Sequence, residues 1–212
     1  METRLRELTV RELLARLATD DPVPGGGSAS ALAGATGAAL VGMVVALTTG
    51  RPAAEGHEEE LAELAARSAR LSDRLQELAE RDAQAYGAVI AARRLPRDSD
   101  DERNARAARI DEATREATLV PLETARTAAE VLALAERLAP IGSRNAVSDV
   151  GVAALLAVAA LRGAAMNVRI NIPYLRDDEP LGEEAARELA RLLDGLDERE
   201  RAIRDAVEQR IG

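Results

Sequence analysis

The chain of 212 residues predicts an all-α fold, an antiparallel bundle of about seven helices in a single domain that spans residues 1–212. Apolar residues recur at the spacing of amphipathic helices along most of its length. No alternating run of β-branched or aromatic residues is longer than a few positions, which argues against strands. Two expected helices are rich in Ala, Gly, Ser and Thr, whose small side chains let helix backbones approach closely in a core or a subunit interface.

Three helices are expected before residue 95. The first follows Thr9, which caps it together with Glu12 three positions later, as in a capping box. The second runs from about residue 28 to 49 and follows a run of glycines. The third spans roughly residues 57–94 with a heptad pattern, and a break over residues 95–99 ends it.

The rest of the chain predicts four more helices. Pro121 is expected to start or kink one of them, because proline lacks the N–H that a helix interior needs. Pro173 and an acidic loop at residues 177–180 are expected to end another. The expected ranges are 100–118, 121–140, 145–172 and 182–210.

Composition excludes several kinds of chemistry. The chain has no Cys, so disulfides, thiolate catalysis and iron–sulfur clusters are ruled out. All 28 basic residues are Arg, which leaves no lysine for a Schiff base or pyridoxal phosphate. The one histidine, His57, lies in a polar stretch, so no metal site or histidine triad is expected. A net charge of -9 and only two aromatic side chains argue against nucleic acid as a partner.

The chain is expected to be cytoplasmic, because its first residues carry charges of both signs rather than a signal peptide. Residues 22–50 include a long stretch without charge, which raises the question of a membrane span. That stretch begins with two prolines and three glycines and is filled with small residues that partition weakly into lipid, so no membrane insertion is expected.

A glycine turn precedes the second expected helix. Pro24, Gly25, Gly26, Gly27 and Ser28 combine backbone freedom, through positive φ, with the free N–H groups of a helix start, which suits an anion. A plain turn before a core helix is the alternative. A Walker A loop is excluded by the lack of Lys, and a dinucleotide-binding loop is excluded because a helix precedes the turn.

Asp82 falls on the apolar seam of the third expected helix. It occupies a heptad position otherwise held mainly by Leu and Val. Because an unpaired buried carboxylate costs several kcal/mol, either an arginine inside the bundle pairs with Asp82 or its chemistry is used. Tyr86, one turn later, could reach the same space.

The sixth expected helix carries four polar residues on one face. Asn145, Asp149, Asn167 and Asn171 fall within an arc of about 80°, at 100° per residue. Asn145 and Asn167 lie about 33 Å apart along the axis, so the two pairs cannot contact one small ligand in one subunit. The second pair is either structural or serves another site, which a neighbouring subunit could complete. Ser148 could equally be a simple N-cap.

Several motifs carry a resemblance in the same order along nearly the whole chain. They are Pro22–Ser28, Arg81–Tyr86, Leu95–Pro96, Val120–Leu122, Asn145–Ala154 and Asn167–Asn171. In these motifs the chain resembles the cyclodeaminase/cyclohydrolase family, which includes the cyclodeaminase half of formiminotransferase-cyclodeaminase and stand-alone methenyltetrahydrofolate cyclohydrolases. It departs at Ile141–Arg144, where relatives often carry a Gly-Asn pair.

The resemblance implies an all-helical, dimeric enzyme whose substrate is a tetrahydrofolate derivative, with no prosthetic group. The first interpretation is a cyclodeaminase, which closes 5-formiminotetrahydrofolate to 5,10-methenyltetrahydrofolate and releases ammonia. The alternative is a cyclohydrolase, which interconverts the methenyl compound and 10-formyltetrahydrofolate with water. A related enzyme with a different amidine-like or pterin substrate, and a catalytically silent helical assembly protein, stay open as further hypotheses.

The site hypothesis that goes with this resemblance has two catalytic carboxylates, Asp82 and Asp149. Asp82 would hold the cationic amidinium and move a proton, while Asp149 would help to position the pterin or the leaving amine. Arg144 or Arg169 would bind the anionic tail of the folate. The expected substrate-binding residues are Pro24, Gly25, Gly26, Gly27, Ser28, Tyr86, Arg144, Asn145, Ser148, Asn167 and Asn171, and no metal ligand is expected.

Overall fold

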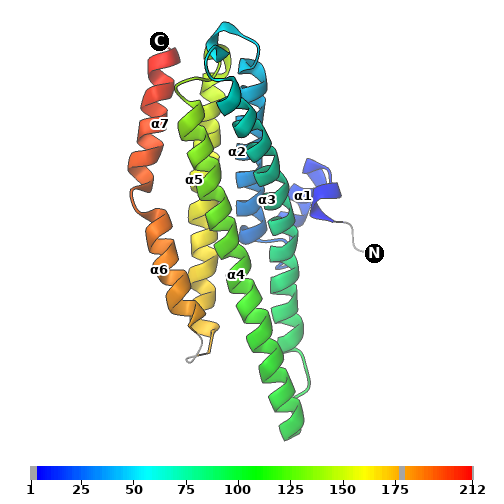
Figure 1. Cartoon of the computed structure of the whole chain (residues 1–212). Coiled ribbons are helices and arrows are strands. Elements are labelled where there is room, and N and C mark those ends of the chain that lie inside the picture. Colours follow the sequence, from blue (N-terminus) through cyan, green and yellow to red (C-terminus); the bar gives the residue numbers. More distant parts are fainter. Residues whose placement is uncertain (1–3, 177–179, 212) are drawn as a thin grey trace.

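The computed structural model describes residues 4–176 and 180–211, and these residues form helices and connecting segments without a strand. Four long helices make the bundle: α2 (Gly26–Thr48), α3 (Glu58–Arg93), α4 (Asp100–Leu138) and α5 (Val147–Asn171). They lie side by side along one axis (Figure 1). Helix α2 packs on α3 and α5, and α4 packs on the same two helices, so the four form a closed ring. The predicted all-α bundle is confirmed.

Shorter helices surround this ring. Helices α6 (Leu181–Leu193) and α7 (Leu196–Ile211) run along the side of the bundle formed by α4 and α5, and α1 (Val10–Leu17) lies apart from them near α3 (Figure 1). The predicted capping box of α1 is confirmed, because Glu12 N–H donates to Thr9 Oγ1 and the Glu12 carboxylate accepts the Thr9 N–H. Four single-turn 3₁₀ helices complete the described chain: η1 (Leu5–Glu7), η2 (Pro52–Ala54), η3 (Arg144–Ala146) and η4 (Ile172–Tyr174).

Small residues let α2 and α5 pack closely. A Cβ added to Gly34 would lie 3.2 Å from Cβ of Ala160, and one added to Gly37 would lie 3.0 Å from the Ala153 carbonyl oxygen. Neither position has room for a larger side chain without movement of the neighbouring helix. These contacts show that the N-terminus of α2 lies at the C-terminal end of α5, an antiparallel arrangement in which a Cβ added to Gly26 would lie 3.8 Å from Asn167 Nδ2.

The heptad seam of α3 faces the core as predicted. Leu61, Leu64, Leu75 and Leu78 are all 1% exposed or less. Asp82 continues this seam and is half-buried, so the backbone geometry of the helix, rather than a loop, fixes the direction of its carboxylate.

The prediction of separate helices over 100–118 and 121–140 is wrong, since α4 continues through Pro121. Proline removes one backbone N–H but does not prevent helical φ, and packing of the long helix on α3 and α5 offsets the lost bond. The side chain of Asn171 binds the carbonyl that Pro121 leaves free, as described below.

The expected helix over 182–210 is in fact two helices. Gly195 has φ of +64°, a left-handed conformation that favours glycine, and this residue separates α6 from α7. Asp194-Gly195 is a common turn pair whose signal the apolar stripe on either side obscured. Of the acidic loop expected at 177–180, residues 177–179 lie outside the described residues.

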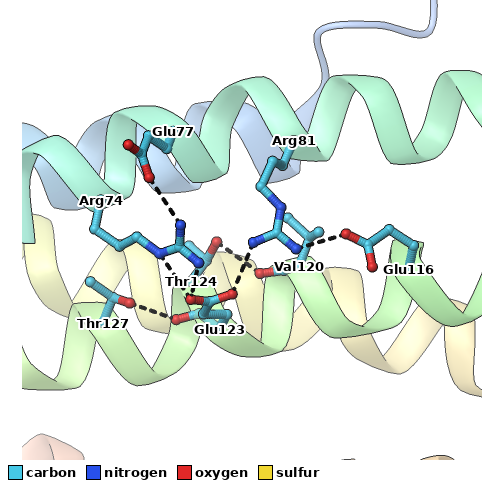
Figure 2. Close-up of polar contacts among 8 residues, drawn as sticks. All are labelled: Arg74, Glu77, Arg81, Glu116, Val120, Glu123, Thr124 and Thr127. Atoms are coloured by element: carbon cyan, nitrogen blue, oxygen red, sulfur yellow. Dashed lines mark hydrogen bonds and ion pairs between the residues drawn. The ribbon is translucent and has the colours of Figure 1, made fainter.

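A network of ion pairs joins α3 to α4 (Figure 2). Glu123 accepts hydrogen bonds from Arg74 Nε at 2.9 Å and from an Arg81 nitrogen at 3.2 Å. Arg81 also binds Glu116 at 2.7 Å. Because Asp82 follows Arg81 and Ala117 follows Glu116, this network fixes the register of the two helices next to the cavity described below.

Within the described residues, two segments are long and apolar enough to cross a membrane, Gly26–Thr48 and Arg144–Tyr174. In each segment, half of the apolar 18-residue window is buried inside the bundle. The absence of a membrane, the cytoplasmic location and the single-domain organisation remain predictions.

Candidate functional site

A cavity of about 260 Å³ opens where the N-terminus of α2, the middle of α3 and the C-terminal end of α5 meet. Its wall combines a glycine backbone, one carboxylate, two side-chain amides and a phenol. It is lined by Pro22, Val23, Gly25, Gly26, Gly27, Asp82, Tyr86, Ala117, Asn167, Ile170 and Asn171. Seven of the predicted site residues thus lie around one cavity, and most of them come from distant parts of the sequence.

Asp82 is held by the first turn of α2. Its Oδ2 accepts a hydrogen bond of 2.9 Å from the Ser28 hydroxyl, and the Ser28 backbone N–H also binds the carboxylate. The same hydroxyl lies 2.9 Å from the Ala79 carbonyl oxygen. The anion that the helix start was predicted to bind is therefore, in this structure, the protein's own carboxylate.

No arginine of the described ranges pairs with Asp82. Its neighbour Arg81 binds Glu116 and Glu123 instead. Burial raises the pKa of the Asp82 carboxyl above the usual aspartate range, and the two hydrogen bonds from Ser28 oppose that rise. Asp82 is thus a desolvated carboxylate beside a cavity, the arrangement expected of a group that exchanges protons.

Close approach, rather than unusual φ, explains the glycine at position 27. A Cβ there would lie 2.5 Å from Cγ of Asp82 and overlap both carboxylate oxygens. The expectation of positive φ in the turn is wrong: the described glycines with positive φ are Gly50, Gly56 and Gly195, whereas Gly25 is extended. Helix α2 also begins at Gly26, two residues earlier than expected.

Two asparagines of α5 line the same cavity as Asp82, and each donates one N–H of its NH₂ group to a backbone carbonyl. Asn167 Nδ2 donates to Gly163 O at 2.9 Å, and Asn171 Nδ2 donates to Ala117 O at 2.7 Å. A carbonyl can only accept, so these contacts fix which side of each amide carries the nitrogen. Their Oδ1 atoms are left as acceptors.

Four residues of the cavity wall were not predicted from the sequence: Pro22, Val23, Ala117 and Ile170. Ala117 could have been found, since it precedes Pro121 by the four residues of a helical hydrogen bond and its carbonyl therefore needs another donor. Tyr86 lies at the rim and is 43% exposed. Pro24 is buried behind the wall and lines a neighbouring hollow instead.

Four predicted site residues, Arg144, Asn145, Ser148 and Asp149, lie at the opposite end of α5. Asp149 is about 27 Å along the helix axis from Asn167. Their expected position beside the glycine turn is therefore wrong within one subunit, because α5 is continuous and antiparallel to α2. The loop before them is held at that end, where Ser143 N–H donates to Thr48 Oγ1 at 2.7 Å and Arg144 Nε donates to the Arg210 carbonyl.

Residues 9–191 match the family model described as formiminotransferase-cyclodeaminase. The chain belongs to this family. It is 44% identical over 185 residues to methenyltetrahydrofolate cyclohydrolase of Methylorubrum extorquens, an alignment that covers 87% of this chain and 88% of the relative. It is 36% identical over 178 residues to formimidoyltransferase-cyclodeaminase of Mus musculus, covering 84% of this chain and 32% of that protein.

A solved member of the family has the same fold. The crystal structure of formiminotetrahydrofolate cyclodeaminase from Thermotoga maritima superposes with a TM-score of 0.86 and 25% identity, over 98% of this chain and 100% of that one. The chain therefore spans about a third of the mouse relative but nearly all of the bacterial ones. Membership of the family confirms the resemblance stated above.

Proposed function

We propose that this protein is a methenyltetrahydrofolate cyclohydrolase, which converts 5,10-methenyltetrahydrofolate and water to 10-formyltetrahydrofolate. The observation that carries the proposal is Asp82, a desolvated carboxylate that borders a cavity beside the first turn of α2 and has no arginine partner among the described residues. The relative of that name matches over nearly the full length of both chains, which supports this reaction over others of the family.

Hydrolysis of the methenyl group needs an anion and proton transfer. Water adds to the methenyl carbon and loses a proton, which gives a tetrahedral carbinolamine. The bond from that carbon to N5 then breaks, N5 gains a proton and the hydroxyl loses one, so the balance is one proton released. A carboxylate next to the carbon stabilises the cationic substrate, accepts the proton of the attacking water and returns one to N5. We assign these steps to Asp82, and no prosthetic group is invoked.

The two asparagines suit the rest of the ligand. One N–H of each NH₂ group is bound to Gly163 or Ala117, so each amide still offers its Oδ1 acceptor and a second N–H to a ligand. The ring of a tetrahydrofolate presents several N–H donors, so Asn167 and Asn171 would bind the pterin while Asp82 faces the one-carbon unit.

To test this proposal, purified protein is mixed with 5,10-methenyltetrahydrofolate, and the decrease of the methenyl absorbance is measured over time. Wild-type protein should accelerate the decay above the buffer rate, and the product should be 10-formyltetrahydrofolate by chromatography. With the Asp82→Asn variant, the methenyl absorbance should decay at the rate seen in buffer alone. Absence of any acceleration by the wild-type protein would contradict the proposal.

Formiminotetrahydrofolate cyclodeaminase is the second candidate, favoured by the structural match to the Thermotoga maritima enzyme. Here N10 attacks the formimino carbon, N10 loses its proton, and the amino group leaves as ammonia. Both reactions pass through a tetrahedral carbon between nitrogens, so the same carboxylate serves either. Growth of the methenyl absorbance from 5-formiminotetrahydrofolate, with ammonia released in equal amount, would establish this activity.

We further propose that two copies pair through an exposed apolar stripe on α5. Val152, Leu155, Met166 and Ile170 are 45–66% exposed and lie within an arc of about 60° at 100° per residue. Met43 and Leu47 of α2 are also exposed and apolar. Apolar patches of this kind commonly mark subunit interfaces. Ile170 also lines the cavity, so the interface would adjoin the site.

Antiparallel pairing of this stripe would give Asp149 a role. If the two α5 helices cross at the middle of the stripe, near residue 161, Asp149 of the partner subunit lies opposite residue 173, about one turn from Ile170. Ser148 precedes Asp149 in the first turn of α5, and Asn145 lies in η3 directly before that helix. The proposal is that these three residues complete the cavity of the neighbouring copy.

Mixing inactive variants tests the shared site. Asp82→Asn and Asp149→Asn proteins, each inactive alone, are combined in equal amounts, unfolded and refolded together. Half of the dimers are then mixed and one of their two sites is intact, so about a quarter of wild-type activity should return. Sites contained within one subunit would instead leave each mixed dimer with two defective sites and no recovery.

A further inference from the structure

A second hollow lies on the other side of the Val23-Pro24 segment from the cavity. It has a volume of about 250 Å³, and its lining includes Arg4, Arg16, Val23, Ala83 and Gly87. Val23 lines both hollows. A ligand that fills the first could therefore extend into the second by passing over one side chain.

The two arginines bring positive charge to this hollow. Within the described part of the chain, neither guanidinium group makes a hydrogen bond or an ion pair. The charge of Arg16 contributes to a lowered pKa of Glu12, but that carboxylate is bound mainly by Thr9. Glu80 also lines the hollow, and its Oε1 accepts the Arg6 backbone N–H at 2.9 Å. The groups left without partners are cationic.

The floor of the hollow is formed by α3, where the small residues Ala83 and Gly87 lie beside the polar side chains of Glu80 and Gln84, and it adjoins the cavity. Asp82 and Tyr86 line the cavity, and the next residues, Ala83 and Gly87, line the hollow. A Cβ added to Gly87 would meet no atom within 4 Å, so the surface there is open. An aromatic group can lie on such a floor while its charged substituent reaches the arginines.

We propose that this hollow binds the carboxylates of the aryl-amide tail of the substrate, with Arg4 and Arg16 as the cationic partners. The inference rests on the proposed folate substrate and assigns its tail. It replaces the expected partners Arg144 and Arg169. Arg144 lies at the far end of α5, and Arg169 is exposed on that helix and outside both hollows.

The test compares Arg4→Gln/Arg16→Gln with the matched control Arg11→Gln, whose arginine lies on α1 but outside the hollow. Substrates carrying one and five glutamates are used. We expect the double variant to raise KM by about tenfold for the pentaglutamate and less for the monoglutamate, as for loss of charge-assisted hydrogen bonds near the surface. The kcat should not change, and the control should match wild type.

Three outcomes would overturn the assignment. One is an unchanged KM for both substrates in the double variant, and another is an equal rise in the Arg11→Gln control, which would indicate a general effect of surface charge. The third is that millimolar phosphate competes with the substrate as strongly in the double variant as in wild type, because the anion would then bind somewhere other than at Arg4 and Arg16. If the wild-type protein is active and one of these results is obtained, only the assignment of the tail is contradicted. If the wild-type protein is inactive, both the proposed reaction and this assignment are contradicted.

Discussion

Asn171 Nδ2 lies 2.7 Å from the carbonyl oxygen of Ala117, the carbonyl that would accept the N–H of residue 121 if that residue were not proline. A side chain of α5 thus replaces a main-chain donor that α4 lacks. The contact joins two helices at the wall of the cavity and fixes the direction of the Asn171 amide. One residue therefore both supplies a donor that α4 lacks and lines the cavity.

This relationship predicts that Asn171 and Pro121 are coupled. Asn171→Leu should lower the free energy of unfolding by about 1–3 kcal/mol, because it leaves a part-buried carbonyl without a donor. Pro121→Ala restores the missing N–H, so in that background the same change should cost clearly less. Urea unfolding of the four proteins gives the coupling energy. Additive effects of the two substitutions would show that the carbonyl is satisfied in some other way.

Adjacent glycines should respond differently to the same substitution. Gly27→Ala places a Cβ on the Asp82 carboxylate and should reduce kcat by at least about tenfold, because a shift of the reacting group by a fraction of an ångström is costly. Gly26→Ala meets only Asn167 Nδ2, at 3.8 Å, and should keep near wild-type activity. Steady-state kinetics of the two variants provide the comparison, with circular dichroism to verify the fold. Equal activity in both would mean that the carboxylate position is unimportant.

Asp82→Asn should remove activity and yet stabilise the protein at neutral pH. Burial raises the folded pKa of Asp82, so the folded state binds its proton more tightly than the unfolded state does. The associated stability is present in full below the unfolded pKa, about 3.9 for an aspartate, and is lost as pH rises through the raised folded value. The wild type should therefore lose stability relative to Asp82→Asn over that interval, and the difference should be smallest at acid pH. Thermal melts of both proteins across this pH range measure the difference in stability. If the hydrogen bonds from Ser28 outweighed desolvation of Asp82, the wild type would instead gain stability relative to the variant as pH rises.

The α5 stripe predicts the oligomeric state. Met166→Glu, at a side chain 66% exposed, should convert the proposed dimer to a monomer, because it places a charge in an apolar interface. Arg169→Gln makes the same change in net charge outside the stripe and should leave the dimer intact. Sedimentation velocity distinguishes the two. A wild-type protein that sediments as a monomer at micromolar concentration would refute the interface.

The sequence predicted most of the fold because its signals were local. Heptad spacing identified α3, and the pair Thr9 and Glu12 marked the start of α1. The errors arose where tertiary packing overruled a local signal, as at Pro121, or where a continuous apolar stripe hid a turn, as at Gly195. Neither outcome follows from the spacing of residues along one helix.

The site was predictable only in part, for a related reason. Asp82 was identified because a carboxylate on a seam of leucines requires a physical explanation. Its grouping with Asp149 within one subunit was wrong, because nothing in the spacing shows which end of α5 meets the glycine turn. That depends on the antiparallel contact of α2 with α5, which Gly34 and Gly37 make possible.

The Ser28 hydroxyl has a single hydrogen and two oxygen neighbours, one on Ala79 and one on Asp82. While Asp82 is ionised, that hydrogen points to the carboxylate. Once the carboxyl gains a proton it becomes the donor, and the hydroxyl rotates toward the main-chain oxygen instead. Rotation about one bond would thus let the proposed acid–base group gain and lose its proton without movement of a helix.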